Sequence, residues 1–371
     1  MRFVIVCGGT GGHFYPGYAL GKVLRARGHQ TLFVLRTDDP AAGRLEAEDL
    51  PSAELELRGM PRGLSARWFT FPWMLLRSLL AARNILRSYA PQAVVGMGGY
   101  LTFPIAFAAR RSRIPYVLHE SNALLGLANR LCAGGAYALA LGLPLCGGAG
   151  ATRSVLTGTP VREELYAGGE PGAARESLGL DPHRRTVLVF GGSQGASAIN
   201  RFVPSALREC ARRQPGGLQV VHLTGLRDEQ SVLQDYRRGA GELKWTVLAY
   251  AQDMAPAYAA ADLVISRSGA STLSELAAQR KPVVLVPYPH AAAGHQTVNA
   301  RVLAQAGAAE VLEESALGTD ALTALLAGLL DGRETLAAMA ASYDRLTIPA
   351  AAHSAAALAD LVEEAAAAQA V

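Results

Sequence analysis

The sequence predicts an α/β protein built from two parallel-sheet domains. At 371 residues, the chain has the length expected of two domains. Short apolar runs alternate with helical stretches, as they do when helices join parallel strands. Glycine-rich turns follow apolar runs in both halves, and turns at the carboxyl ends of parallel strands line ligand crevices. We therefore expect two domains with opposed crevices and a boundary near Pro160.

In the first half, strands and helices should alternate up to about residue 132. The short apolar runs predict strands, and the longer periodic stretches predict helices. The expected elements are 2–7, 16–27, 31–35, 72–89, 93–96, 101–110, 115–118 and 123–132. The Gly- and Pro-rich segment 142–160 then separates the two halves.

The second half repeats the pattern. The expected elements are 186–190, 199–212, 218–223, 228–237, 245–248, 254–260, 262–265, 271–279, 282–286 and 295–306. The alanine-rich stretch 335–371 predicts helix, because alanine has the highest helix propensity, with a break near Pro349.

The composition narrows the class of protein. Half of the residues are hydrophobic, which is enough for large cores. The four cysteines lack paired spacing, which argues against a disulfide framework or a zinc site and favours a reducing compartment. Met1 and Arg2 lead directly into the first strand, so we expect no signal peptide. No apolar run is long enough to span a bilayer.

The net charge of +4 is unevenly distributed. Residues 1–160 carry 17 Lys and Arg against 8 Asp and Glu, whereas the remaining residues carry 18 against 23. No acidic residue occurs between Glu56 and Glu120, an interval with nine arginines. The first half should therefore face an anionic partner, such as phospholipid or a phosphorylated substrate. Nucleic acid ranks lower, because the arginines are mixed with aromatic and leucine residues and no nucleic-acid motif is present.

The aromatic part of this interval, from Trp68 to Tyr89, predicts a helix at a membrane surface. Its apolar side chains can enter the headgroup boundary while its arginines contact anionic lipid. The residues expected at the membrane are Trp68, Phe69, Phe71, Trp73, Leu76, Leu79, Leu80, Arg77 and Arg83. The alternative is an ordinary core helix with solvated arginines.

The turn 191–196, between an apolar run and an expected helix, predicts an anion site. Its glycines let the backbone approach a ligand, the helix start attracts negative charge, and Ser193 adds a hydroxyl. The turn has neither the ending of a P-loop nor the dinucleotide fingerprint. Glycine turns also follow apolar runs at 8–13 and 96–100. A tight strand-to-helix turn without a ligand is the alternative.

Polar residues beside these turns are candidates for proton transfer and for ligand binding. The helix dipole should disfavour the charged form of His13, leaving it able to accept a proton. The segment 119–122 follows a strand, so its polar groups should line a crevice. Arg162 can reach a phosphate. The alternatives are a packing histidine, a polar turn and a solvated linker arginine, respectively.

Two segments of the second half predict contacts to a sugar and a ribose. Glu275 lies about one turn into a helix, where its carboxylate can accept two hydrogen bonds from a ribose diol. A capping box between Ser271 or Thr272 and Glu275 is a serious alternative, since Thr272 and Glu275 have the spacing of that motif. The loop 287–296 has amides that can bind sugar hydroxyls, or that merely cap the loop. No D-x-D motif is present, so we expect no metal and no cofactor; glycine-loop amides, a helix dipole and Arg162 would stabilise a leaving diphosphate.

Together these segments resemble the MurG family of peptidoglycan N-acetylglucosaminyltransferases, which convert lipid I to lipid II. The matching segments keep the family's order and cover nearly the whole chain: GGTGGH (8–13), GMGGY (96–100), HESN (119–122), GTPVR (158–162), GGSQGA (191–196), RSGASTLSE (267–275) and HQTVNA (295–300). HESN replaces the family's usual HEQN, and GTPVR replaces GNPVR. The first change shortens the side chain beside Asn122, and the second leaves Arg162 in place.

The resemblance implies a GT-B fold, in which two Rossmann-like domains face each other across a cleft. Residues 1–160, joined by the last helix 348–371, would form the acceptor and membrane side, and 161–347 would bind UDP-GlcNAc. The implied reaction transfers GlcNAc from UDP-GlcNAc to the 4-hydroxyl of MurNAc in lipid I, undecaprenyl-pyrophosphoryl-MurNAc-pentapeptide. Inversion implies one displacement through an oxocarbenium-like transition state. The reaction needs a base for the acceptor hydroxyl and stabilisation of departing UDP.

The resemblance also assigns roles by motif position. His13 is the candidate base. The donor-binding residues are Thr10, Gly11, Gly12, Asn122, Arg162, Ser193, Ala251 (through its backbone, to uracil), Ala270, Ser271, Thr272, Leu273, Ser274, Glu275 and Gln296. The acceptor-binding residues are Gly98, Gly99, Tyr100 and Glu120. The implied location is peripheral, on the cytoplasmic face of the cell membrane, with the anionic inner leaflet and cell-wall synthesis proteins as partners.

Three other functions stay open. A UDP-GlcNAc 2-epimerase, or another nucleotide-sugar enzyme of this architecture, would release a soluble sugar product. An NAD-dependent Rossmann enzyme has weak support, because Phe14 occupies the position of the third fingerprint glycine. A non-catalytic membrane-binding protein would not need this cluster of motifs. Thermal stabilisation by UDP-GlcNAc but not by NAD would separate these functions.

Overall fold

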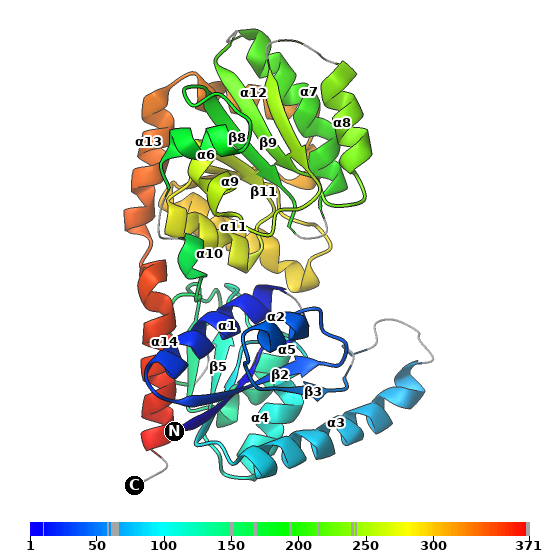
Figure 1. Cartoon of the computed structure of the whole chain (residues 1–371), viewed down its shortest axis with the longest axis vertical. Helices are drawn as coiled ribbons and strands as arrows, with labels where there is room; N and C mark the ends of the chain where they lie inside the picture. The colour runs from blue at the N-terminus through cyan, green and yellow to red at the C-terminus, as the bar shows by residue number, and fades with distance from the viewer. Residues whose placement is uncertain are drawn as a thin grey trace. The chain divides into compact units, whose positions relative to one another are not determined.

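The computed structural model describes residues 1–9, 11–57, 59–60, 67–148, 152–165, 169–192, 195–213, 216–238, 241 and 243–368. The chain forms two compact units (Figure 1). The first contains Met1–Arg162 and Ile348–Val371, and the second contains Glu163–Thr347. Each unit has a parallel sheet, which confirms the predicted α/β class. In the described part of the chain, no helix is both long and apolar enough to cross a bilayer.

The sheet of the first unit has the strand order β3-β2-β1-β4-β5-β6-β7, and all of its neighbouring strands are parallel. Its strands are β1 (Arg2–Val6), β2 (Gln30–Arg36), β3 (Ser52–Leu55), β4 (Ala93–Gly96), β5 (Tyr116–Glu120), β6 (Ala138–Leu141) and β7 (Ser154–Leu156). The chain first proceeds from β1 out to β3, then returns to the other side of β1 to form β4. The strand order therefore reverses between β1 and β4.

Helices cover both faces of this sheet (Figure 1). One face packs against α1 (Gly11–Ala26) and α14 (Ala351–Ala367), and the other against α3 (Arg67–Tyr89), α4 (Thr102–Arg111) and α5 (Leu127–Cys132). The short α2 (Ala42–Ala47) follows β2. Successive strand residues point to opposite faces. In β1, Phe3 and Ile5 pack on the α1 side, whereas Val4 and Val6 pack on the α3 side.

The last helix, α14, packs into the core of the first unit although it is the end of the chain. Leu358, Ala359 and Val362 are fully buried in the same cluster as Phe3 and Ile5. Ion pairs flank this apolar strip: Arg27 contacts Asp360 at 2.7 Å and Glu363 at 3.1 Å, and Arg153 contacts Glu364 at 2.7 Å. The first unit is therefore built from two separate segments of the chain, with the whole second unit between them in the sequence.

The second unit has the strand order β10-β9-β8-β11-β12-β13, again with parallel neighbours. Its strands are β8 (Arg185–Phe190), β9 (Leu218–Leu223), β10 (Lys244–Leu248), β11 (Leu263–Ser266), β12 (Val283–Leu285) and β13 (Ala309–Val311). Its main helices are α6 (Pro171–Ser177), α7 (Ser197–Arg213), α8 (Glu229–Arg238), α9 (Ala255–Ala260), α10 (Ala270–Gln279), α11 (His295–Ala306), α12 (Thr319–Leu330) and α13 (Arg333–Ala341). The strand order reverses between β8 and β11.

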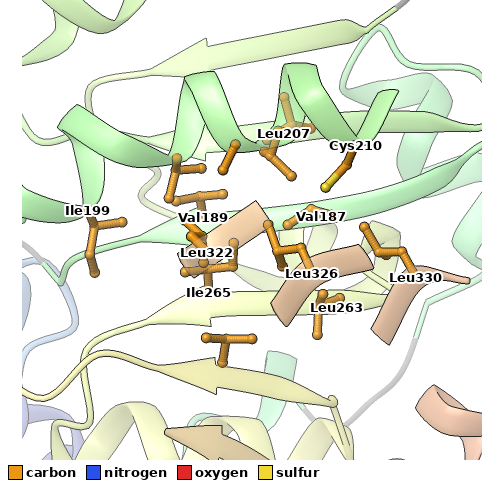
Figure 2. Close-up of a cluster of buried hydrophobic side chains, with 14 of the residues drawn as sticks. Val187, Val189, Ile199, Leu207, Cys210, Leu263, Ile265, Leu322, Leu326 and Leu330 are labelled. Carbon is orange, nitrogen blue, oxygen red and sulfur yellow. The ribbon is translucent and has the colours of Figure 1, made fainter. Parts of the chain in front are cut away.

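The core of the second unit lies between this sheet and α7 and α12 (Figure 2). Val187 and Val189 of β8 contact a cluster that contains Leu207 of α7 and Leu326 of α12. The apolar positions of β8 and β11 that were expected to be buried are indeed buried.

Several element boundaries differ from the predictions. The segment 142–160, expected to be a separator, contains the edge strand β7, which is too short and too exposed to give an apolar run. The first helix begins at Gly11 rather than residue 16, because Pro16 lies inside the helix. The helix expected over 72–89 begins at Arg67 and contains Pro72. Helix α5 begins at Leu127, four residues later than expected.

Candidate functional site

In each unit, glycine turns lie where the strand order reverses. In the first unit, the turns after β1 and β4 flank the reversal point. In the second, the turn after β8 and the start of α10 after β11 flank it. Ligands of open parallel sheets bind outside the carboxyl ends of the strands at this point. Helix starts there also attract anions. Each unit therefore has a candidate site for a phosphorylated ligand.

In the first unit, the two glycine turns meet at His13. A Cβ atom added at Gly98 would lie 3.1 Å from the imidazole of His13, and one added at Gly99 would lie 3.3 Å from it. Both glycines have positive φ angles, of 95° and 73°. The backbone of the second turn thus packs closely on the ring of His13, with positive φ angles that favour glycine.

The surroundings of His13 favour the neutral form of its imidazole. Close packing disfavours the charged form and lowers the pKa of His13, and the nearby Glu120 only partly opposes this effect. His13 is nonetheless partly exposed to solvent. A neutral and accessible imidazole at a helix start can accept a proton from a substrate.

Glu120 organises the loop that follows β5. Its Oε1 accepts hydrogen bonds from the backbone N–H of Asn122 at 3.1 Å and from the Asn122 side chain at 2.9 Å. Its Oε2 accepts from the N–H of Gly126 at 2.8 Å and from Nδ2 of Asn129 at 3.0 Å. Glu120 is also almost fully buried. Its carboxylate therefore positions Asn122 and the loop, and the acceptor contact predicted for Glu120 stays a prediction.

His119 joins three motifs beneath this loop. Its Nε2 donates to the carbonyl oxygen of Gly158 at 3.2 Å, and the Ser121 hydroxyl lies 3.4 Å from Nδ1. Burial lowers the pKa of His119 to about 4, so the ring is neutral at physiological pH. Gly158 has a φ of 72° and lies against Ser354 of α14. His119 therefore connects the HESN loop, the GTPVR turn and the last helix.

Arg162 lies over an aromatic ring of the first helix. Its guanidinium carbon is 4.5 Å from the ring centroid of Tyr15, a cation–π distance. A Cβ atom added at Gly11 would lie 3.5 Å from the same ring. Tyr15 therefore brings Arg162 close to the start of α1. Tyr15 could not be identified from the sequence, because its partner Arg162 is far away in the chain.

In the second unit, Glu275 is held by an aromatic hydroxyl. The Tyr258 hydroxyl donates to Oε2 of Glu275 at 2.9 Å, and Tyr258 itself is fully buried. Helix α10 begins at Ala270, with Gly269 as the N-cap and no side-chain cap hydrogen bond. The capping box between Thr272 and Glu275 is therefore wrong, because both residues lie inside the helix.

The other predicted donor residues of α10 differ in exposure. Ala270, Ser271 and Thr272 form its first turn, where backbone N–H groups point out of the helix. Ser271 and Thr272 are partly exposed, whereas Ala270, Leu273 and Ser274 are buried, and the Ser274 hydroxyl donates back to the carbonyl of Ala270 at 3.0 Å. The side chains of Leu273 and Ser274 face the interior, so the first turn is the part of α10 suited to a ligand.

Gln296 shapes the loop after β12. Its Oε1 accepts from the backbone N–H of Tyr288 at 2.9 Å, and its own carbonyl accepts from the Ser268 hydroxyl at 2.8 Å. Arg267 donates to the carbonyls of Val286 and Pro287 at 3.0 and 3.2 Å. These contacts bind the loop 286–288 to the RSGASTLSE segment.

Some predicted site residues cannot be placed. Thr10 and Ser193 lie outside the described residues. Ala251 is partly buried after β10, and Gly11 and Gly12 lie in the first turn of α1. Within the ranges that the structure describes, no group of three or more His, Cys, Asp or Glu side chains is arranged to hold a metal ion.

The motifs and folds of both units match known proteins. Residues 3–140 match the glycosyltransferase family 28 N-terminal domain, and residues 186–361 match the glycosyltransferase family 28 C-terminal domain. The UDP-N-acetylglucosamine–N-acetylmuramyl-(pentapeptide) pyrophosphoryl-undecaprenol N-acetylglucosamine transferase of Elusimicrobium minutum is 38% identical over 98% of this chain and 99% of its own length. The protein of the same name from Halorhodospira halophila is 42% identical over 90% of this chain and 91% of its own.

The chain belongs to the MurG family of glycosyltransferases. The crystal structure of MurG from Acinetobacter baumannii superposes with a TM-score of 0.79 at 28% identity, covering 98% of this chain and 99% of that one. This membership confirms the predicted GT-B class and the prediction of a glycosyltransferase. The roles predicted for individual residues and for the two units stay predictions.

The exposed apolar surface of this MurG-family chain extends beyond α3, the helix for which a membrane contact was predicted. On α3, Trp68, Phe69, Trp73, Leu76 and Leu80 are exposed, as are Arg77 and Arg83, whereas Phe71 and Leu79 are partly buried. Phe107 of α4 and Leu127 and Leu131 of α5 are also exposed. Helix α4 contacts both α3 and α5, so these residues share one side of the first unit. We call the eight exposed apolar residues of α3, α4 and α5 the apolar face.

Proposed function

We propose that this chain transfers GlcNAc from UDP-GlcNAc to the 4-hydroxyl of MurNAc in lipid I and so forms lipid II for peptidoglycan synthesis. The observation that carries the proposal is that each unit places a chemically suitable side chain at the point where the strand order of its sheet reverses. In the first unit, His13 lies at the reversal of strand order, and in the second, Glu275 follows the turn at the equivalent point. The names of the full-length relatives support the same reaction.

The donor contacts are proposed mainly in the second unit. The turn 191–196 and the first turns of α7 and α10 would bind the diphosphate, because helix starts stabilise negative charge. Glu275, held by Tyr258, would accept hydrogen bonds from the ribose diol. Ala251 would contact uracil through its backbone, and Gln296, which fixes the loop 286–288, would position that loop against the sugar.

The acceptor contacts are proposed in the first unit. Gly98, Gly99 and Tyr100 would bind the pyrophosphate of lipid I beside His13. Neutral His13 would remove the proton from the MurNAc hydroxyl as its oxygen attacks the anomeric carbon of GlcNAc. The bond between the anomeric carbon and the UDP oxygen would break as the bond to the MurNAc oxygen forms, in a single displacement that inverts the anomeric configuration.

The leaving UDP would be stabilised by preorganised positive groups. Amides of the glycine turns, the start of α7 and the guanidinium of Arg162 would meet the charge that develops on the diphosphate. Asn122, positioned by Glu120, would add a neutral donor.

The membrane role follows from the acceptor and the apolar face. An undecaprenyl chain stays in the bilayer, so the enzyme must reach its substrate at the surface. We place the apolar face of α3, α4 and α5 against the cytoplasmic leaflet, with Arg77, Arg83 and Arg87 beside anionic headgroups. Cell-wall synthesis proteins would be its partners there.

Transfer of labelled GlcNAc to a lipid I analogue tests the proposal directly. We expect a β-linked disaccharide product that depends on both substrates and persists in EDTA. A UDP-GlcNAc 2-epimerase would instead release an epimerised soluble sugar without acceptor, and that outcome would overturn the proposal. A thermal shift with UDP-GlcNAc but not with NAD provides an independent check.

A further inference from the structure

A network of buried, hydrogen-bonded polar side chains lies inside the second unit, next to the turn 191–196. His222, near the end of β9, is completely buried, and Asn200 of α7 and Tyr236 of α8 are almost completely buried. Apolar residues such as Ile199, and others of the same core cluster, surround them. Polar groups in such a setting destabilise a fold unless they are hydrogen-bonded.

The hydrogen bonds of this network fix the orientation of each of its side chains. His222 Nε2 is 3.0 Å from Oδ1 of Asn200, and His222 Nδ1 is 3.1 Å from the Tyr236 hydroxyl. Asn200 Nδ2 donates to the carbonyl oxygen of Thr224 at 2.8 Å and to Oδ2 of Asp228 at 2.9 Å. Because those two partners only accept, Nδ2 is the amide nitrogen and Oδ1 faces His222. His222 therefore carries its proton on Nε2, and Tyr236 donates to Nδ1.

His222 can act here only as a neutral ring. Burial lowers the pKa of His222 to about 3, so the imidazole does not become charged at physiological pH. It is therefore unsuited to proton transfer with a substrate, and its contribution must come from the geometry that it imposes on Asn200.

At the end opposite Tyr236, this network contacts the glycine turn through the carbonyl of Thr224. A Cβ atom added at Gly195 would lie 2.2 Å from the oxygen of Thr224, so the turn packs against the atom that Asn200 binds. Gly195 has a φ of 75°, and its N–H donates to the carbonyl of Gly192 at 3.0 Å, which closes the turn. Asp228 also accepts from the hydroxyl of Ser197, the first residue of α7, at 2.7 Å.

We propose that His222 is a positioning residue for the diphosphate of the donor. It holds Asn200, and Asn200 holds the Thr224 carbonyl and Asp228, which together set the positions of Gly195 and of the first turn of α7. This inference rests on the proposed function, because the ligand of the turn is taken to be the UDP part of UDP-GlcNAc. It does not require His222 to touch the ligand.

The test compares UDP with uridine, which lacks the diphosphate. His222→Asn is too short to reach Oδ1 of Asn200, whereas His222→Gln can place an amide nitrogen near the position of Nε2. Calorimetric titration should show UDP affinity reduced by about tenfold in His222→Asn, the equivalent of one lost hydrogen bond in the network. Uridine affinity should stay within about twofold of the wild type, and His222→Gln should recover most of the UDP affinity.

Tyr236→Phe is the matched structural control. It leaves Nδ1 of His222 without its donor and should lower the melting temperature, but the bond to Asn200 remains, so the ratio of UDP to uridine affinity should not change. If His222→Asn behaves like this control, with an unchanged ratio, the inference is overturned. If the wild type binds no UDP at all, the proposed function itself fails, and this inference fails with it.

A surface variant covers the case in which His222→Asn does not fold. Ser197 is exposed and lies at the outer end of the network, so Ser197→Ala leaves the core intact. We expect UDP affinity to fall about threefold with no change for uridine, as befits loss of one partly solvated hydrogen bond. An unchanged UDP affinity in this variant would also contradict the proposal.

Discussion

At the residue scale, His13 has surroundings that favour a base over an acid. Close packing lowers its pKa below the usual histidine value, and the two glycines of the second turn hold its ring in place. His13 should therefore become protonated at a lower pH than an exposed histidine does.

His13→Ala should lower kcat about 10²- to 10⁴-fold with little change in donor affinity. The wild-type profile of kcat against pH should fall on the acid side, and the variant should lose that fall. His183→Ala, at an exposed histidine of the second unit, should leave both rate and profile unchanged. If the fall on the acid side persists in His13→Ala, His13 is not the base. Its role would then be to orient the acceptor.

Glu275 and Tyr258 give a second prediction. If Glu275 binds the ribose diol, Glu275→Ala should weaken UDP-GlcNAc binding by about 1.5–3 kcal/mol, the value of a hydrogen bond to a charged group. Tyr258→Phe removes the hydroxyl that holds the carboxylate, so it should weaken binding to a smaller extent. Calorimetry with UDP and with 2′,3′-dideoxy-UDP decides, because the dideoxy ligand should bind the wild type and Glu275→Ala equally. Equal losses for both ligands would contradict the ribose role.

The candidate site could be predicted from the sequence only in part. Glycines, His13 and Glu275 belong to short motifs whose spacing is visible in the chain. Tyr15, Tyr258 and His222 were not identified, because each acts on a partner brought close only by folding: Arg162, Glu275 and Asn200. The capping box was wrong for a related reason. Its spacing is correct, but the helix begins two residues before Thr272.

At the scale of elements, α3 divides its surface between the core and the outside. Ala82 and Leu86 are buried against the sheet and α4, whereas Phe69, Trp73, Leu76 and Leu80 are exposed on the other side. The exposed side is apolar toward the start of the helix, and exposed Arg83 and Arg87 follow toward its end. This division combines the two readings left open by the sequence, because the same helix is both a core helix and a candidate membrane surface.

Removing the apolar face should weaken membrane binding without unfolding the protein. We expect Trp73→Ala with Leu76→Ala to reduce co-sedimentation with anionic vesicles, since each of these side chains is exposed. Arg83→Ala should reduce binding by about 1 kcal/mol, and added salt should weaken all binding. Leu226→Ala, at the most exposed leucine of the described second unit, is the matched control and should change nothing. Equal binding to neutral and anionic vesicles would contradict the proposed surface.

Most strands were predictable from their apolar runs, whereas helices α2, α6 and α12 were not predicted. All five strands expected in the second half are present within two residues of their predicted bounds. Four of them, β8, β9, β11 and β12, are buried parallel strands, which read as continuous apolar runs. Four strands were missed: β3, β6, β7 and β13. The edge strands β3, β7 and β13 have three or four residues and exposed positions, so none gives a periodic signal. Strand β6 is fully buried, but it has only four residues and half of them are alanine, which favours helix. The start of α1 was missed because its first turn consists of the glycines that also form the candidate site.

At the scale of the whole molecule, the last helix makes the first unit dependent on both ends of the chain. Leu358 and Val362 of α14 are fully buried with residues of β1, β2 and β4. Arg27 and Arg153 form ion pairs with carboxylates of the same helix, and His29 Nε2 lies 3.0 Å from Oε1 of Glu363. The second unit has its own core, to which α14 contributes no residue of the described cluster. The stability of the two units should therefore respond separately to changes in α14.

Leu358→Ala tests this separation. Truncating a fully buried leucine should lower the free energy of unfolding of the first unit by about 2–5 kcal/mol, because a cavity is left in a packed core. Hydrogen exchange should show faster exchange in β1, β4 and β5, while β8, β9 and β11 keep the protection of the wild type. Leu326→Ala, an equally buried leucine in the core of the second unit, should give the reverse pattern. Uniform loss of protection in both units after either substitution would show that the chain unfolds as one cooperative body, and the role of α14 as a part of the first unit alone would then be wrong.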